Sequence, residues 1–205
     1  MARSRARDYD EKRLSLLRQA AAVFARDGFD RASMAGLASE CGVSKALFYH
    51  YYASKEALLF DIISSHLDEL LEAIEAADNP VLAPEARLEV LVAALLDVYR
   101  DADAKHKLQT GAMRLLPDSD QAHLKGLERQ IVARFADAVM AIAPEAFEGT
   151  PLLKPVTMSL FGMLNWFYMW FREGGPVSRA DYARLATRLL VAGVRDLAAD
   201  SMTSR

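Results

Sequence analysis

The sequence has few of the features that mark disulfide-linked or membrane-spanning proteins. It contains one cysteine in 205 residues, Cys41, so no disulfide can form within the chain. Its longest apolar stretch, Met158 to Phe171, is shorter than the roughly 20 residues that cross a bilayer, and it contains Asn165. The Arg-rich first residues lack the apolar segment of a secretory signal. We therefore expect a cytoplasmic protein in a reducing compartment, with no membrane partner.

The motifs of common enzyme and metal sites are also absent from the sequence. The four histidines, His50, His66, His106 and His123, are scattered, with no HExxH motif and no cysteine pair. No glycine-rich phosphate loop and no GxSxG motif occur. The simplest interpretation of His106 and His123 is two surface histidines. We predict no catalytic residues, no metal site and no cofactor, which leaves a small helical enzyme only as an alternative.

Charge is unevenly distributed along the chain. The net charge is −3, but residues 1–55 carry ten basic and six acidic side chains, a balance of +4 that leaves −7 for the remainder. Arg3, Arg5 and Arg7 contribute to this basic end. A basic end on an acidic body is typical of a protein with one DNA-facing end, and a chance asymmetry is the less favoured alternative.

Apolar residues recur with a helical period along almost the whole chain, and no alternating strand pattern is present. We therefore predict an all-α fold of about nine helices. Serine caps and glycine or proline breakers set the expected boundaries. The first four predicted elements are a helix carrying Leu14, Leu17, Ala21 and Phe24 on one face and stopping at Gly28, short helices from Ser33 to Glu40 and from Ser44 to about Tyr51, and a long helix from Lys55 to about Ala77.

The remaining predicted helices follow the same reasoning. Pro84, Pro117, Pro144 and the Gly174–Pro176 stop divide this part of the chain. The expected elements are a helix with the apolar stripe Leu88, Leu91, Val92, Leu95, Leu96 and Tyr99, a shorter one from about Lys105, one from about Leu124 to Ile142, a very apolar one from Pro151 to about Arg172, and a last one capped by Ser178 with the stripe Tyr182, Leu185, Leu189, Leu190, Gly193 and Leu197.

The second and third predicted helices form a helix-turn-helix pattern around Gly42. Val43, Phe48 and Tyr52 are spaced to face inward, which leaves another face of the third helix for a DNA major groove. Lysine and tyrosine offer donors to phosphates and base edges, and serine caps add free backbone N–H groups. The predicted DNA-contacting residues are Ser33, Ser44, Lys45, Ala46, Leu47, Tyr49, His50, Tyr51 and Lys55.

This stretch resembles a known family over about Lys12 to Leu59. The residues that carry the resemblance are Leu17, Ala20, Ala21, Phe24, Gly28, Leu37, Ala38, Gly42 to Lys45, Phe48, Tyr49, Tyr51, Tyr52, Ser54 to Glu56, Leu58 and Leu59. They are similar to the N-terminal domain of the tetracycline-repressor (TetR) family. Phe48 stands where the family usually has leucine, and Tyr52 where phenylalanine is common. The resemblance implies the same DNA-contacting positions and a helical ligand-binding body.

The resemblance also implies a homodimer, formed by two helices at about 151–172 and 178–197. Ala186, Ala192 and Gly193 would allow close helix approach there, although ordinary packing within the chain is the alternative. Two recognition helices about 34 Å apart would read a pseudo-palindromic operator. A division into a DNA-binding domain at 1–55 and an effector-binding and dimerisation domain at 56–205 follows.

The apolar body predicts a pocket for a small hydrophobic effector. The Asn165-Trp166, Trp170-Phe171-Arg172 and Gly174-Gly175-Pro176 segments resemble TetR-type regulators of fatty-acid, steroid or aromatic-acid degradation, several of which sense acyl-CoA esters. Arg129, Arg134, Lys154 or Arg172 would pair with the anionic end of such a ligand, or else lie solvated at the surface. The predicted ligand-binding residues are Tyr99, Met113, Leu116, Arg134, Phe135, Met158, Phe161, Asn165 and Trp166.

Together these features predict a ligand-responsive DNA-binding transcriptional regulator, most simply a repressor released from its operator by the effector. A DNA-binding protein without any small-molecule effector is the main alternative. For single residues such as Met158 and Phe161, ordinary core packing explains the same apolar pattern.

Overall fold

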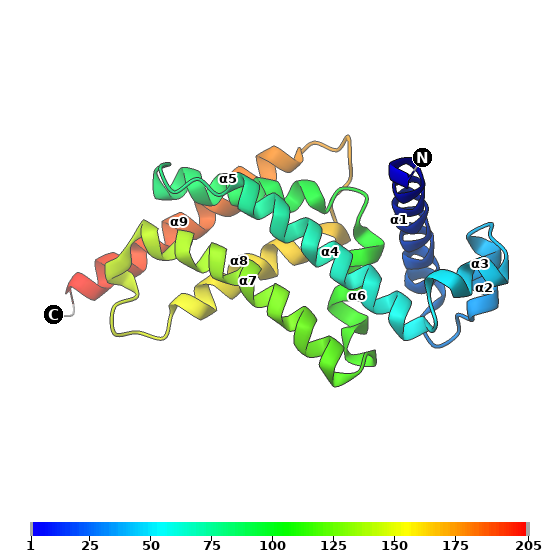
Figure 1. The fold of residues 1–205 in the computed structure, drawn as a ribbon. Helices are drawn as coiled ribbons and strands as arrows, with labels where there is room; N and C mark the ends of the chain where they lie inside the picture. The colour runs from blue at the N-terminus through cyan, green and yellow to red at the C-terminus, as the bar shows by residue number, and fades with distance from the viewer. Residues whose placement is uncertain (1, 204–205) are drawn as a thin grey trace. The chain divides into compact units, whose positions relative to one another are not determined.

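The computed structural model describes the backbone of residues 2–203 and the side chains of residue 9 and residues 11–200. Within these residues there are nine α-helices, three 3₁₀ turns and no strand, as the sequence predicts (Figure 1). Arg3, Arg5 and Arg7 of the predicted basic end lie outside the described side chains. Contacts divide the chain into two compact units that do not follow chain order: residues 1–68 with 101–126, and residues 69–100 with 127–205.

The first unit holds the helix-turn-helix. It contains α1 (Ala2–Asp27), α2 (Met34–Glu40), α3 (Lys45–Tyr51), the start of α4 (Lys55–Ala77), α6 (Asp103–Ala112), the turn η1 (Met113–Leu115) and the start of α7 (Asp118–Ile142). α1 packs against both α2 and α6, and α2 packs against α3. Lys107 of α6 donates a hydrogen bond of 3.0 Å to the carbonyl oxygen of Ala25 near the end of α1. The short helices α2 and α3 therefore rest on a larger helical base.

The buried face of α1 differs in part from the predicted one. Leu17 and Phe24 are buried as predicted, but Leu14 is 43% exposed and Leu16 is fully buried. Because α1 packs against two other helices, its buried face is centred near Ala20. Leu14 lies about 120° around the helix from Ala20, at roughly 100° per residue, and falls at the edge of that face.

The second unit contains the end of α4, α5 (Pro84–Val98), the end of α7, the turn η2 (Pro144–Ala146), α8 (Leu153–Asn165), the turn η3 (Phe167–Met169) and α9 (Arg179–Thr203). α9 packs against α5, α8 and η2, and Figure 1 shows α5 and α9 side by side. The predicted stripe of α5 is confirmed, because every one of its residues is buried. These are Leu88, Leu91, Val92, Leu95, Leu96 and Tyr99.

The apolar helix predicted from Pro151 to about Arg172 is shorter in the structure. α8 begins only at Leu153, with Pro155 in its first turn, where the missing N–H group breaks no hydrogen bond. It ends at Asn165, and the η3 turn follows. The prediction of one continuous helix to Arg172 was wrong, because apolar character alone does not separate a helix from an aromatic turn.

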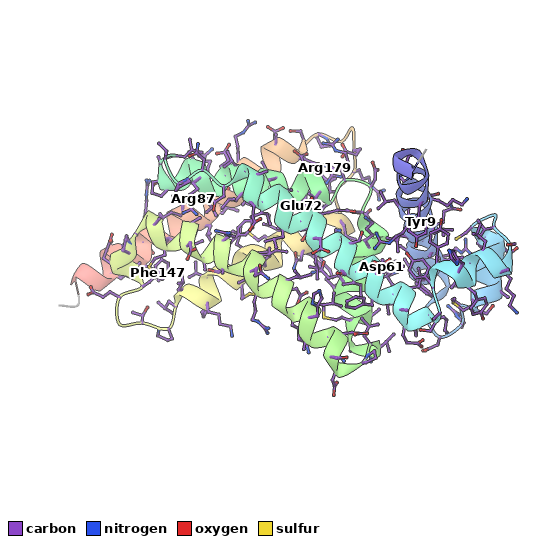
Figure 2. The ribbon with its side chains drawn as sticks, viewed as in Figure 1. Tyr9, Asp61, Glu72, Arg87, Phe147 and Arg179 are labelled. Atoms are coloured by element: carbon purple, nitrogen blue, oxygen red, sulfur yellow. The ribbon has the colours of Figure 1, made fainter. Side chains whose placement is uncertain are left out.

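Aromatic packing explains why α8 ends early. The ring of Phe167 stacks on Phe171 at 4.2 Å and on Tyr182 of α9 at 4.9 Å between ring centroids. The guanidinium of Arg179, labelled in Figure 2, lies over both phenylalanine rings, at 5.3 and 4.8 Å from their centroids. The Tyr182 hydroxyl donates a hydrogen bond of 3.1 Å to the carbonyl oxygen of Met163. This aromatic cluster fixes the connection between α8 and α9.

The predicted stripe of α9 mixes two different faces of the helix. Leu190 is buried as predicted, but Leu185 and Leu189 are 48% and 57% exposed, and Gly193 is exposed as well. The inward face is formed instead by Ala183, Ala186, Thr187, Leu190 and Val194. α9 therefore has apolar residues on two sides, and only one of them is covered by the rest of the chain.

Candidate DNA-binding site

Side-chain caps set the two helices of the helix-turn-helix in place. The Ser33 hydroxyl accepts a hydrogen bond of 3.1 Å from the Gly36 amide, and the Ser44 hydroxyl accepts one of 3.1 Å from the Leu47 amide. Both are the predicted N-caps. Gly42 has φ of +62°, a left-handed conformation that favours glycine and allows the tight turn between α2 and α3. The Ser33 and Ser44 hydroxyls thus accept hydrogen bonds from free backbone amides at the starts of α2 and α3. Their contact with DNA phosphates stays a prediction.

The recognition helix α3 has one buried and one exposed side, divided as predicted. Phe48 is fully buried and Tyr52 is 6% exposed, whereas Leu47 and Tyr49 are 39% and 44% exposed. The remaining residues of the exposed side are Lys45, Ala46 and His50. The Lys45 Nζ atom lies 5.9 Å from the centroid of the Tyr49 ring. A cation, a small residue, a hydroxyl and an imidazole therefore share one solvent-facing surface, which is the chemistry that major-groove binding uses.

Two of the predicted contact residues also pack within the unit. The Tyr51 ring is stacked on the Tyr9 ring of α1, at 4.7 Å between centroids, so α1 supports this end of α3 (Figure 2 labels Tyr9). The Lys55 ammonium donates hydrogen bonds of 2.9 Å to the carbonyl oxygen of Phe29 and 3.4 Å to that of Asp30. It also lies 4.6 Å from the Phe29 ring centroid. Lys55 thus ties α4 to the loop between α1 and α2.

Sequence reasoning missed a polar network centred on Asp61 of α4, labelled in Figure 2. The Tyr52 hydroxyl donates a hydrogen bond of 2.6 Å to Asp61 Oδ2, and Arg13 Nε donates one of 3.0 Å to the same atom. Arg13 Nη2 pairs with Asp61 Oδ1. Burial, followed by the bond to Asp61, raises the pKa of the Tyr52 phenol, and the same carboxylate raises the pKa of Arg13. The network joins α1 and α4 to the end of the recognition helix, over sequence separations that no local pattern reveals.

The predicted ligand-binding residues fall into several different environments. In the second unit, the buried Tyr99 donates a hydrogen bond of 2.8 Å to Asn165 Oδ1, and the Phe135 and Phe161 rings meet edge to face at 5.0 Å. Burial raises the pKa of the Tyr99 phenol. These two pairs join α5 or α7 to α8, so the structure brings together side chains that the sequence grouped on apolar pattern alone.

Other predicted ligand residues lie elsewhere. Met113 and Leu116 are buried in the first unit. Arg134 forms an exposed ion pair of 3.0 Å with Glu75. Met158 and Trp166 are 45% and 61% exposed, so their side chains lie on the surface of the second unit. That position favours contact with a partner over a role in lining a pocket.

Two histidines form a buried pair that the sequence analysis missed. His66 of α4 and His106 of α6 are fully buried or nearly so, and their ring centroids are 6.2 Å apart. The interpretation of His106 as a surface histidine was wrong, whereas His123 is exposed as predicted. Burial, then the neighbouring His106 and Lys105, lower the pKa of His66 to about 3. The signal was present in the sequence, since His66 lies four residues after Ile62 and four before Leu70 on the buried face of α4.

Metal-ion clusters and membrane-spanning helices are both missing from the described residues. No group of three or more His, Cys, Asp or Glu side chains among them is arranged to hold a metal ion. In the same part of the chain, no helix combines the length and apolar character needed to cross a membrane.

The fold and the exposed face of α3 define a helix-turn-helix DNA-binding protein. Residues 16–62 match the family described as bacterial regulatory proteins, tetR family, and residues 81–194 match the family described as tetracyclin repressor-like, C-terminal domain. The chain belongs to the tetracycline-repressor (TetR) family and is a transcriptional regulator rather than an enzyme, as the sequence resemblance predicts.

Individual relatives match along most of the chain. A TetR-family regulator from Bordetella parapertussis 12822 is 31% identical, with a TM-score of 0.81 over 87% of this chain and 93% of that one. The repressor KstR2 of Mycobacterium tuberculosis is 22% identical over 187 residues, which cover 90% of this chain and 94% of KstR2. AibR, solved with isovaleryl coenzyme A and operator DNA, is 21% identical with a TM-score of 0.75 over 88% and 98% of the two chains. The last two likenesses support the same helical architecture over nearly the full length.

Proposed function

We propose that this regulator binds operator DNA through the exposed face of α3, with Lys45, Tyr49 and His50 as its principal contacts. The observation that carries the proposal is the division of α3, whose apolar side is sealed by Phe48 and Tyr52. α3 has seven residues, and its exposed Lys-Ala-Leu-x-Tyr-His face offers hydrogen-bond donors, a small residue for close approach and an apolar side chain for contact with a thymine methyl. We also propose a DNA-binding domain at residues 1–55, an effector-binding and dimerisation domain at residues 56–205, and a cytoplasmic location.

The second unit offers a surface for a homodimer through α8 and α9, close to the predicted segments 151–172 and 178–197. Met158 and Trp166 at α8, and Leu185 and Leu189 on α9, are between 45% and 61% exposed. Gly162 of α8 is exposed too, and a Cβ atom added there would meet nothing within 4 Å. Large apolar side chains and small residues on neighbouring helices favour burial against another protein surface. A two-fold dimer would present two recognition helices to a pseudo-palindrome.

A hydrophobic carboxylic acid or its coenzyme A thioester is the effector class that we propose. The partly buried Tyr99–Asn165 hydrogen bond lies in the second unit with the Phe135–Phe161 pair, and ligand sites typically place a few polar groups among apolar walls. AibR, which was solved with isovaleryl coenzyme A, supports this class, and the description of KstR2 as a ketosteroid regulator supports a hydrophobic effector more generally. Effector binding would favour a conformation with low operator affinity, so repression would be relieved.

One experiment tests the proposal in two stages. Operator sequences are first selected from random DNA, and we expect a two-fold symmetric site. The release of that DNA is then measured against a panel of acyl-CoA esters, free acids and unrelated apolar drugs. Release by acyl-CoAs supports the effector class, and release only by the drugs contradicts it. The absence of any stabilising or releasing ligand would favour the second candidate, a DNA-binding protein without effector.

A further inference from the structure

The uncovered face of α9 carries a regular pattern of its own. Leu185, Leu189, Ala192, Asp196 and Ala199 are all exposed and are spaced by four, three, four and three residues. This spacing places them along one stripe of the helix, opposite the buried face. The stripe changes along its length, because both leucines are in its first half and both alanines are at its centre or in its second half.

A groove lies beside this stripe. Glu85, Ala86 and Glu89 of α5 form one wall, and residues of α9 that include Leu185, Leu189 and Ala192 form the other. Its volume is about 660 Å³. The exposed stripe is therefore flanked by a hollow rather than by a flat surface, which suits the side chains of a helix laid along it.

Two opposite charges are placed symmetrically about the middle of the stripe. Arg188 and Asp196 are exposed, four residues before and four residues after Ala192. Neighbouring arginines are engaged within the subunit, since Arg184 pairs with Asp181 and Arg195 pairs with Glu85. Among the residues that the structure describes, neither Arg188 nor Asp196 has an ion-pair partner.

We propose that α9 packs antiparallel on α9 of a second copy of this chain, with the two-fold axis passing at Ala192. The inference rests on the proposed homodimer and specifies its register. In a two-fold antiparallel pair, a residue n positions before Ala192 faces the residue n positions after it in the other copy. Arg188 then meets Asp196 of the partner subunit, and the reciprocal pair forms as well. Leu185 meets Ala199 of the partner subunit, so a large side chain lies against a small one.

Small residues at the centre permit the close approach that this register needs. Ala192 and Gly193 are adjacent and exposed, and a Cβ atom added to Gly193 would meet nothing within 4 Å in its own subunit. Glycine inside a helix is unfavourable by about 1 kcal/mol relative to alanine, so packing within the subunit gives no reason for it. A second helix packed at an interaxial distance near 8 Å, the low end of the usual range, would explain a glycine at this position.

The same charges oppose the neighbouring registers. A shift of the axis by about one turn toward Arg188 would bring the two copies of Arg188 together. A shift by one turn toward Asp196 would bring the two carboxylates together. Like charges brought together disfavour these alternative registers, in addition to the opposite charges that favour the proposed one. The register is thus specified by the Arg188–Asp196 ion pair, which forms twice in each dimer.

Charge reversal tests the pairing in the full-length protein. We expect Arg188→Glu and Asp196→Arg each to raise the dimer Kd about tenfold or more in sedimentation, because each change places two like-charged pairs in the interface. The double variant with both changes restores the pairs with reversed sign, and its Kd should return to within about threefold of the parent value. Glu72→Arg, an exposed change on α4 labelled in Figure 2, serves as the matched control and leaves the Kd unchanged.

Cross-linking tests the position of the axis without altering charge. Ala192→Cys should form a disulfide between subunits under mild oxidation, because the two copies of residue 192 meet at the axis. Leu185→Cys should form none, since its two copies would be separated by 14 residues along the pair, about 21 Å at 1.5 Å per residue. The parent protein is the control, because its Cys41 is buried.

The outcomes separate this register from the dimer itself. A parent protein that is dimeric, with no rescue in the double variant and no disulfide at residue 192, would overturn the register and leave the homodimer standing. A parent protein that stays monomeric both free and on operator DNA would overturn both.

Discussion

The residue that organises the DNA-binding unit is Asp61, which contacts no part of the exposed α3 face. Its carboxylate receives hydrogen bonds from Tyr52, at the end of α3, and from Arg13 of α1. Such bonds to a charged acceptor are stronger than neutral ones, and removing the charge leaves a buried hydroxyl and a guanidinium with a weaker partner. The orientation of the recognition helix therefore depends on a side chain of α4.

Asp61→Asn should lower the free energy of unfolding by about 1–3 kcal/mol, because hydrogen bonds to a charged group contribute roughly that much. Urea unfolding measures the loss. Tyr52→Phe removes one of the bonds and should cost less, about 1 kcal/mol. Asp68→Asn is the matched control, since Asp68 is exposed on the same helix. An Asp61→Asn protein as stable as the control would show that the network is not stabilising.

Lys45 and Lys55 are both predicted to meet DNA, but their surroundings separate their effects. Lys45 is exposed on α3, whereas Lys55 bonds to two loop carbonyls. We expect Lys45→Met to weaken operator binding and to reduce the slope of log K against log salt by about 1 for each phosphate that the lysine neutralises, with stability unchanged. Lys55→Met should also lower the unfolding midpoint in urea. A slope unaffected by Lys45→Met would remove this residue from the set of phosphate-binding side chains.

At the scale of helices, local patterns predicted most boundaries, but they did not predict the end of α8, which depends on packing against another helix. The caps at Ser33, Ser44, Ser54 and Ser178 are all present, because a cap depends only on residues three positions away. The end of α8 was missed, since it depends on stacking of Phe167 with Tyr182 from another helix. A helix cap is determined by a few neighbouring residues, whereas packing between helices depends on residues far apart in the sequence.

The two faces of α9 show the same limit for the candidate site. Apolar period predicts that a helix has a buried stripe, but it does not say whether the cover comes from the same subunit. Leu189 and Leu190 are adjacent in sequence, yet one is 57% exposed and the other 8%. Likewise, the exposed face of α3 followed from spacing alone, while the Asp61 network behind it joins residues 48 positions apart. The exposed face of a helix was predictable from sequence, whereas the contacts between distant residues that hold the helix in place were not.

The buried His66–His106 pair gives the packing of α4 on α6 a pH dependence. The folded protein holds His66 with a pKa near 3, below the 6.5 of an unfolded chain, so protons bind preferentially to the unfolded state. Stability from this group is therefore complete above about pH 6.5 and is lost progressively as the pH falls toward 3. Between pH 8 and pH 5 the loss should be about 2 kcal/mol.

Urea unfolding at several pH values measures this loss. His66→Phe removes the titrating group from the buried position, and its stability curve should be flatter over the same range than that of the parent. His123→Phe is the control, because His123 is exposed in the same unit. Parallel curves for the parent and His66→Phe would contradict a neutral buried imidazole.

At the scale of the whole molecule, regulation requires that effector binding and operator binding both act on the same conformational equilibrium. If an effector and the operator favour different conformations, each lowers the affinity of the other by the same factor. The Tyr99–Asn165 hydrogen bond links the end of α5 to α8, and a ligand bound there would either leave this bond intact or replace it with bonds of its own. It belongs to the second unit and α3 to the first, so the residues proposed to sense a ligand and those proposed to read DNA lie in different units.

The two tryptophans of the chain offer a direct optical test of the proposed dimer. Trp166 and Trp170 are the only ones in the sequence, and they are 61% and 47% exposed beside the proposed dimer surface. Dimerisation should bury Trp166 and shift its emission to shorter wavelength, with a concentration midpoint equal to the Kd from sedimentation. Trp166→Ala should raise that Kd about 30-fold, since truncating a central aromatic at an interface costs about 2 kcal/mol. Val81→Ala, a change at a 90% exposed loop residue, should leave the Kd as it is. Emission that stays constant while sedimentation reports dimers would place Trp166 outside the interface and restrict the contact to α9.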